Sequence, residues 1–200
     1  MTLSEVKELI RASTSDVLLS SPISDTELNM LIYVKMQDLA KLINDYDYEF
    51  YKEKIEFEQN YSGFGLVDRV AYSAEIFIYK LVSAYLKSGS DLYSMSISTV
   101  DGVHQDTLNQ NENGSIAFSN AAFYVHPPTE VTGDYNLYCT ICSYPQMPAD
   151  DTSIVNVPPQ FLDYLVSLCK RAIYEKASWS VPKSIFDNIA LNEYRIINKA

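Results

Sequence analysis

The residues in this sequence whose side chains could best bind a metal or take part in catalysis are a cysteine pair and two histidines. Cys139 and Cys142 have the C-x-x-C spacing found in zinc and redox sites. They lie in a segment whose alternating pattern predicts a strand, and residues three apart on a strand point to opposite faces. There is no second cysteine pair, and His104 and His126 lie far apart in the chain. We therefore expect no metal site and no redox pair, and we expect buried, inert thiols at these two positions and at Cys169.

The remaining polar residues do not form a recognisable catalytic pattern. His126 precedes two prolines, which favours an extended backbone, and His104 is expected to face solvent. The chain has no Gly-x-Ser-x-Gly elbow, and the pair Gly63-x-Gly65 lacks the rest of a phosphate-binding loop. Adjacent acids such as Asp150 and Asp151 are common on protein surfaces. The sequence predicts that the protein is not an enzyme and holds no cofactor or metal.

Composition excludes several other classes. The chain has 200 residues, of which 47% are hydrophobic and 20% charged, as in soluble globular proteins. Its formal net charge of −11 disfavours a broad basic surface for DNA or for an anionic membrane. Three cysteines do not suit a disulfide framework, and neither a signal peptide nor a membrane span is recognisable. We expect a soluble, cytosolic chain.

Tyrosines and acids carry a second kind of signal. The sixteen tyrosines offer large contact areas with a polar end, which suits interfaces. Residues 45–61 mix acids with aromatics, and their pattern fits either a strand or a continued helix. The acids of this segment form either a solvated face over buried aromatics or an electronegative wall that a polyanion slides past without binding.

Two helices are predicted at the amino-terminal end. The first is short and amphipathic, with Ser4 as its cap. The second begins at Ser24-x-x-Glu27, which is a capping box, and its apolar residues recur at helical spacing to about Asn44.

The middle of the chain is predicted to change from helix to strand. Apolar residues at helical spacing predict a helix over residues 67–88, and Gly89 is placed as its left-handed cap. Residues 92–100 alternate like a strand and lead into Asp101-Gly102, a favoured hairpin dipeptide. Further strands are predicted at residues 115–125 and 134–144.

Two helices close the chain. Pro159 is well placed as the first residue of one helix, and Pro182 precedes the other. The predicted fold class is therefore α+β, with N-terminal helices, a β-rich middle and a C-terminal antiparallel helix pair. We expect a single domain over residues 1–200 with a β-rich insertion around residues 90–145.

The C-terminal quarter resembles the closing unit of tailed-bacteriophage head-to-tail adaptor proteins, the neck or connector rings beneath the portal. In that family a strand ending in Tyr-Pro, a polar loop, a proline-initiated helix and an antiparallel final helix recur. The matching residues here are 137–145 for the strand, 157–166 for the helix start, 172–177 for the helix and Tyr194-Arg195 near the end of the final helix. The capping-box helix after a short first helix is similar to the family's opening.

The resemblance implies a structural role in the virion neck, for a protein made in the host cytoplasm. About twelve copies would form a ring docked to the portal protein, extend the DNA channel and offer a platform for the next neck or tail protein. DNA would pass through without specific binding during genome ejection, which the acidic charge suits, and no membrane is implied. The alternatives are another tail-completion or minor capsid protein, or a small ligand-binding domain or enzyme.

Two segments are the candidates for contacts with neighbouring proteins. One is the polar tip of the predicted hairpin, at residues 109–114, and the other is the C-terminal segment 189–200. The candidate contact residues are Asn109, Gln110, Asn111, Asn113, Ile189, Tyr194, Arg195, Ile196 and Ile197.

Overall fold

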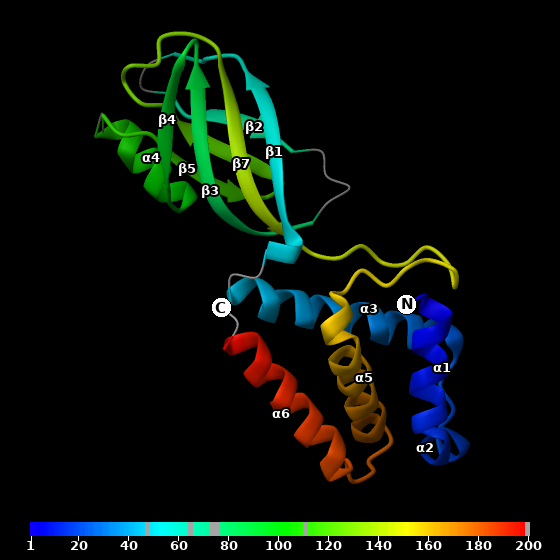
Figure 1. Cartoon of the computed structure of the whole chain (residues 1–200). Coiled ribbons are helices and arrows are strands. Elements are labelled where there is room, and N and C mark those ends of the chain that lie inside the picture. The colour runs from blue at the N-terminus through cyan, green and yellow to red at the C-terminus, as the bar shows by residue number, and fades with distance from the viewer. Residues whose placement is uncertain (47–48, 64–65, 73–76, 110–111, 199–200) are drawn as a thin grey trace. The chain divides into compact units, whose positions relative to one another are not determined.

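A computed structural model describes residues 1–46, 49–63, 66–72, 77–109 and 112–198. It contains helices and one mixed seven-stranded sheet, which confirms the predicted α+β class. Two compact units divide the chain. The helical unit comprises Met1–Tyr51 with Tyr144–Ala200, and the sheet unit comprises Lys52–Ser143. The helical unit is thus built from both ends of the chain, as the blue and orange-to-red segments of Figure 1 show.

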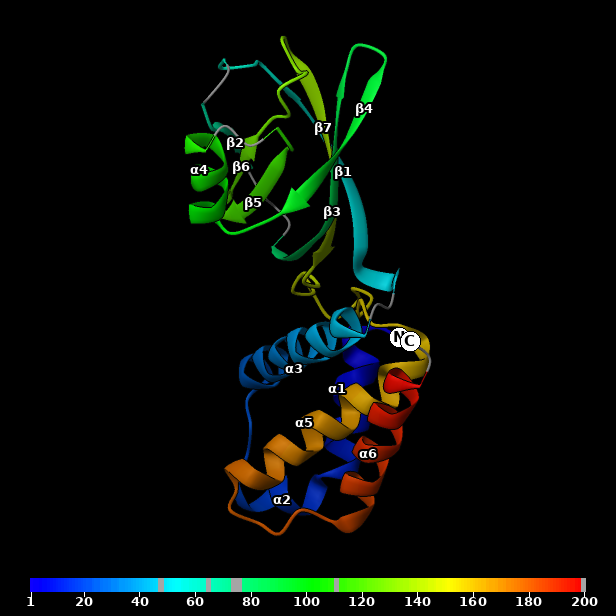
Figure 2. The same cartoon turned by 90° about the vertical axis from the view of Figure 1, so that its left-hand side faces the viewer.

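The helical unit has α5 at its centre. Its α-helices are α1 (Leu3–Ser13), α2 (Ser15–Ser20), α3 (Asp25–Asp45), α5 (Leu162–Lys176) and α6 (Lys183–Ile197), with short 3-10 turns at Glu49–Tyr51 and Pro159–Phe161. Helix α5 contacts α1, α3 and α6, and α6 runs back along it as the predicted antiparallel partner (Figures 1 and 2). Leu165, Cys169 and Ile173 of α5 are buried in the shared core.

Capping boxes begin both long N-terminal helices. At α3 the Ser24 hydroxyl accepts a bond from the Glu27 amide at 3.3 Å, and the Glu27 carboxylate accepts one from the Ser24 amide at 3.0 Å, as predicted. At α1 the predicted cap Ser4 is wrong. Thr2 caps this helix, because Thr2-x-x-Glu5 forms its own capping box, with the Glu5 carboxylate 2.8 Å from the Thr2 amide.

The sheet unit consists of one curled sheet and one helix. Its elements are β1 (Lys52–Gln59), β2 (Asp68–Ala71), β3 (Ile78–Ser88), β4 (Asp91–Ile97), α4 (Val100–Leu108), β5 (Ser115–Ser119), β6 (Ala122–His126) and β7 (Tyr135–Ser143). The strand order is β1-β7-β3-β4-β5-β6-β2. Although β1 and β6 are distant in this order, the rings of Phe57 and Phe123 lie 5.3 Å apart, so the sheet curls around its own core (Figure 2).

The predicted helix over residues 67–88 is wrong, because this segment forms β2 and β3. The pairing of β3 with β7 contains two register shifts, one of them between Leu81 and Ser83. This irregularity places the buried residues Leu81 and Ala84 three positions apart, which imitates helical spacing. Gly89 does have a left-handed φ of +60°, but it lies in the turn between β3 and β4. The strands therefore begin at Lys52, well before residue 90.

The predicted hairpin turn at Asp101-Gly102 is also wrong. These residues lie in the first turn of α4, where the Thr99 side chain accepts a bond from the Gly102 amide at 3.1 Å and caps the helix. Strands β4 and β5 then pair in parallel, with Ile97 opposite Ile116, and parallel neighbours need a crossover such as α4. Residues 109–114 therefore connect a helix to a strand and are not the tip of a hairpin.

In the acidic segment 45–61, whose structure the sequence left open, Asp45 ends α3, a 3-10 turn spans Glu49–Tyr51, and strand β1 follows, while residues 47 and 48 lie outside the described residues. This strand pairs with β7 along one side and lies at the edge of the sheet. Glu56 and Glu58 are exposed, while Ile55 and Phe57 pack against the core of the sheet unit. Charged side chains along an edge strand discourage pairing with other strands. Both the solvated face and the electronegative wall have this arrangement of exposed acids over apolar residues, so the choice between them stays a prediction.

Candidate interaction surfaces

The cysteines and histidines do not converge on a site. All three cysteines are free and buried, and burial raises the pKa of the Cys139 thiol to about 12. Across the described part of the chain, no cluster of three or more His, Cys, Asp or Glu side chains could hold a metal ion. His104 is exposed on α4, as predicted, whereas His126 is buried at the end of β6. The expected burial of the thiols is confirmed.

One buried carboxylate is held for a structural purpose. Asp68 on β2 is 1% exposed and accepts bonds from the Tyr135 hydroxyl at 2.7 Å and from the Ser62 amide at 3.0 Å. Burial, and then the bond to Asp68, raises the pKa of Tyr135 above its ordinary value. The pair joins β2, at one edge of the sheet, to β7, near the other edge. It therefore holds the sheet in its curled form.

The polar segment after α4 is only partly described. Asn109 ends α4 and is exposed, and Asn113 is exposed as well. Gln110 and Asn111 lie outside the described residues. Gly114, at the end of the segment, is buried so tightly that a Cβ atom would lie 2.6 Å from Met95 Sδ and 2.7 Å from Pro128 Cδ. The segment is thus anchored to the sheet unit at this end.

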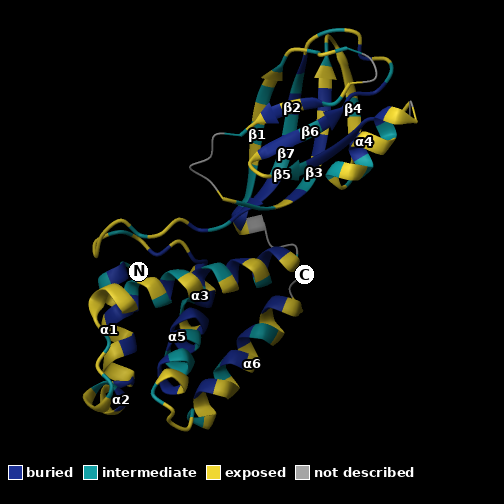
Figure 3. Cartoon of the chain, turned by 180° about the vertical axis from the view of Figure 1, so that it is seen from behind, coloured by how far each residue is buried: buried dark blue, intermediate teal, exposed yellow. Residues whose placement is uncertain are grey.

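The C-terminal candidates divide between the two faces of α6. Ile189 and Ile196 are buried in the core of the helical unit, so they are not surface residues. Tyr194, Arg195 and Ile197 are exposed. The division follows from helical geometry, because residues that are three or four apart share a face. In Figure 3, buried and exposed residues alternate along the ribbon of α6, because successive turns bring each face of the helix round again.

The exposed face of α6 carries a continuous apolar stretch with a charge at each end. We call it the α6 stripe. It consists of Asp187, Ala190, Leu191, Tyr194 and Arg195, all exposed and at helical spacing. Leu191 is 49% exposed and Tyr194 is 64% exposed. The opposite face is fixed to α5, where the Tyr164 hydroxyl donates to the Glu193 carboxylate at 2.8 Å.

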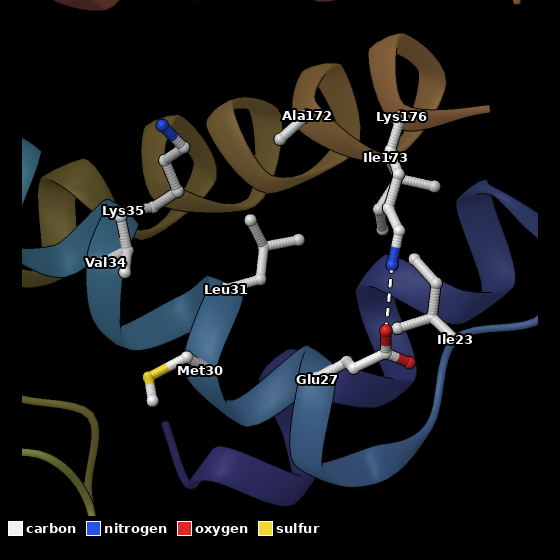
Figure 4. A pocket seen from close by; sticks show the side chains of 9 residues that line it. All are labelled: Ile23, Glu27, Met30, Leu31, Val34, Lys35, Ala172, Ile173 and Lys176. Carbon is white, nitrogen blue, oxygen red and sulfur yellow. Dashed lines mark hydrogen bonds and ion pairs between the residues drawn. The ribbon is translucent and has the colours of Figure 1, made fainter. Parts of the chain in front are cut away.

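A second apolar surface lies between α3 and α5. We call it the α3–α5 groove, and its volume is about 410 Å³ (Figure 4). It is lined by Ile23, Glu27, Met30, Leu31, Val34, Lys35, Ala172, Ile173 and Lys176. Met30 and Val34 are 54% and 41% exposed, which is high for apolar side chains on a packed helix. No residue of α6 lines this groove.

Ion pairs fix the charged residues of the groove. Lys176 donates to the Glu27 carboxylate at 2.9 Å, and Lys35 donates to Asp38 at 2.8 Å (Figure 4 draws the first pair). The hydrogen bond from Lys176, followed by that from the Ser24 amide, lowers the pKa of Glu27 to about 2. Glu27 therefore carries its negative charge throughout the neutral and mildly acidic range.

Sequence reasoning found part of this arrangement. It identified Tyr194 and Arg195, but it missed the groove and the other members of the α6 stripe. The signal was available, since exposed apolar residues recur at spacings of three and four on faces away from the buried residues of both helices. Recognising that signal requires knowledge of which apolar face each helix buries, and this depends on the packing around α5.

The described residues contain no helix that is long and apolar enough to cross a membrane. Comparison of the chain with protein-family models and with curated protein sequences gives no match.

Proposed function

We propose that this protein is a structural component of a tailed-bacteriophage neck. Several copies form a ring below the portal, extend the DNA channel and connect the head to the next neck or tail protein. The proposal is carried by one observation: the helical parts of the two separated segments that resemble adaptor proteins come together in a single helical unit, while the strand of the C-terminal segment, residues 137–143, belongs to the sheet unit. Helices α1 and α3 pack with α5 and α6 there, and the sheet unit is an insertion between them (Figure 1).

The surfaces of the helical unit support assembly into a ring. The α6 stripe and the α3–α5 groove are two different apolar surfaces on one unit. A contact between two different surfaces is heterologous, so every copy can bind one neighbour on each side. Such contacts close into rings when the rotation between successive copies allows it.

The negative charge of the chain supports a role in lining a channel through which DNA passes without being bound. The formal net charge is −11, and Glu56 and Glu58 project from an exposed edge strand. Like charge repels the phosphate backbone, whereas binding would require lysine and arginine contacts to phosphates. A channel lined in this way lets DNA move without adhering.

The test is the mass of the assembly formed with a candidate portal protein, measured by native mass spectrometry. The expected result is that copies of 22.7 kDa join the portal as a ring of about twelve. Tyr194→Asp is expected to lower the number of bound copies. Leu19→Asp is the matched control, since Leu19 is 88% exposed on α2 and outside both surfaces. A chain that binds neither portal nor any neck protein overturns the proposal and directs attention to ligand binding in the α3–α5 groove.

A further inference from the structure

We propose that the α6 stripe of one copy packs against α3, antiparallel to it, in the α3–α5 groove of a second copy of this chain. The inference rests on the proposed ring and deepens it by naming the subunit contact. It assigns a partner to each of the two exposed apolar surfaces of the helical unit.

The two surfaces cannot meet within one copy. Helix α6 is bound to α5 through its opposite face, where Ile185, Ile189 and Ile196 are buried. The groove is lined by α3, by α5 and by Ile23, and α6 contributes nothing to it. Figure 2 shows that α3 and α6 lie against different parts of α5, and both helices contact it. Helix α6 of the same copy therefore cannot fill the groove, and an α6 stripe that fills it comes from another copy.

Charge complementarity identifies that molecule as a second copy. On α3, the acid Glu27 and the base Lys35 are eight positions apart, a distance of about 12 Å along a helix. On α6, the acid Asp187 and the base Arg195 have the same order and the same spacing. An antiparallel alignment places Arg195 opposite Glu27 and Asp187 opposite Lys35. Each new contact would join an ion pair already present in one copy, that of Glu27 with Lys176 or that of Lys35 with Asp38. A parallel alignment would place like charges together at both ends, which costs affinity.

The apolar residues between these charges also correspond. On α3 they are Met30, Leu31 and Val34, and on α6 they are Ala190, Leu191 and Tyr194. In both helices they occupy the positions three, four and seven after the acid, so each set forms one continuous face. Ala190 is small enough for close approach of the helices, and Met30 has a flexible side chain that adapts to a partner. Burial of these side chains supplies the driving force for the contact.

Each copy offers one stripe and one groove, so the contact propagates from copy to copy. The geometry predicts chains that grow beyond two copies and close as a ring on the portal. A reciprocal exchange, with each copy filling the groove of the other, would stop at two copies. The number of linked copies therefore distinguishes the proposed contact from a closed dimer.

A charge exchange tests the pairing of Lys35 with Asp187. Lys35→Glu and Asp187→Lys are each expected to weaken association of the full chain about tenfold or more, because each places like charges together. The double variant in one chain restores opposite charges at every contact and is expected to recover most of the wild-type affinity. Glu8→Lys, on the exposed side of α1, makes the same charge change as Asp187→Lys and is expected to have no effect. Sedimentation velocity, with and without portal, gives the association constants.

Circular dichroism checks that each single variant folds. Unchanged association in both single variants overturns the inference, as does a double variant that is weaker than either single one. If the wild type assembles on the portal and both single variants assemble equally well, only this contact fails. If the wild type remains at 22.7 kDa under all conditions, the proposed function fails as well.

A disulfide tests the antiparallel alignment independently. The double variant Leu31→Cys with Leu191→Cys places the two thiols opposite one another in the proposed contact, and the native cysteines are buried. Mild oxidation is expected to give a ladder of linked species above two copies on a non-reducing gel. The matched control, Leu31→Cys with Leu19→Cys, is expected to give none. Equal cross-linking in both variants, or a ladder that stops at two copies, overturns the proposed contact.

Discussion

Replacing Tyr135 by phenylalanine removes a single oxygen atom from the interior of the sheet unit. The ring remains, so the buried apolar area hardly changes. Asp68 loses the donor at 2.7 Å and keeps, among the described residues, the bond from the Ser62 amide at 3.0 Å. A carboxylate that is 1% exposed cannot obtain a replacement bond from bulk water. The substitution therefore isolates the contribution of one hydrogen bond to a buried charge.

The size of the effect follows from that arrangement. A hydrogen bond to a charged group contributes roughly 1.5 to 3 kcal/mol, and a buried acceptor left short of a donor is costly. Because the Ser62 amide still donates one hydrogen bond to Asp68, we expect the free energy of unfolding of the sheet unit to fall by about 2 kcal/mol.

Urea unfolding measures this loss when the two units are followed separately. Trp179, the single tryptophan, lies in the helical unit, so its fluorescence reports that unit alone. The near-ultraviolet circular dichroism of tyrosine includes the sheet unit. The control is Tyr138→Phe on the same strand, where the hydroxyl bonds to the exposed Glu56 and its removal is expected to change little. Equal midpoints for Tyr135→Phe and Tyr138→Phe would refute the structural role given to Asp68.

An alkaline titration provides a second readout of the same pair. The pKa of Tyr135 is raised in the folded protein, first by burial and then by the bond to Asp68. Tyrosine in an unfolded chain ionises near pH 10. The contribution of neutral Tyr135 is therefore fully present below about pH 10 and is lost as the pH rises above that value. Tyr135→Phe is expected to make the loss of stability at high pH less steep.

Three further predictions concern thiols, acid stability and the autonomy of the helical unit. The three cysteines are expected to resist a thiol reagent at pH 8 and all to react in denaturant; rapid labelling of the native protein would contradict their burial. The pKa of Glu27 is lowered from 4.5 to about 2, so its stabilising contribution is present above pH 4.5 and is lost as the pH falls toward 2. Glu27→Gln is expected to flatten acid unfolding over that range, whereas an unchanged profile would contradict it. A chain in which a short Gly-Ser linker replaces residues 52–143 is expected to retain helical circular dichroism and cooperative melting, and a disordered product would show dependence on the sheet unit.

The parts of the fold that could be predicted from sequence are those fixed by local interactions. The box at Ser24 and Glu27 satisfies amides at the start of α3 with side chains only three residues away. Pro159 likewise begins the turn that leads into α5, because its fixed φ suits a helix start and its missing amide hydrogen is not needed there. Neither signal depends on distant parts of the chain, so both helix starts form where the sequence predicts them.

The parts that could not be predicted depend on distant partners. The pattern of β3 imitates a helix because its pairing with β7 contains register shifts, and nothing within β3 itself reveals them. The Asp101-Gly102 pair suits a hairpin locally, yet the parallel pairing of β4 with β5 requires a crossover connection, which α4 provides. The two surfaces of the helical unit were hidden for the same reason, since exposure is set by the packing of α3 and α6 on α5.

The pairing of β1 with β7 explains how the sheet unit can interrupt the helical unit. The chain enters the sheet unit at β1 and leaves it at β7, and Lys52 lies directly opposite Cys142 in the antiparallel register. Paired residues in such a ladder are only about 5 Å apart. The points where the chain enters and leaves the sheet unit are therefore neighbours, so a short linker could join the two segments of the helical unit. An insertion joined in this way can vary without disturbing the packing of α3 and α6 on α5. We therefore expect the surfaces proposed to join copies into a ring to persist when a linker replaces the sheet unit.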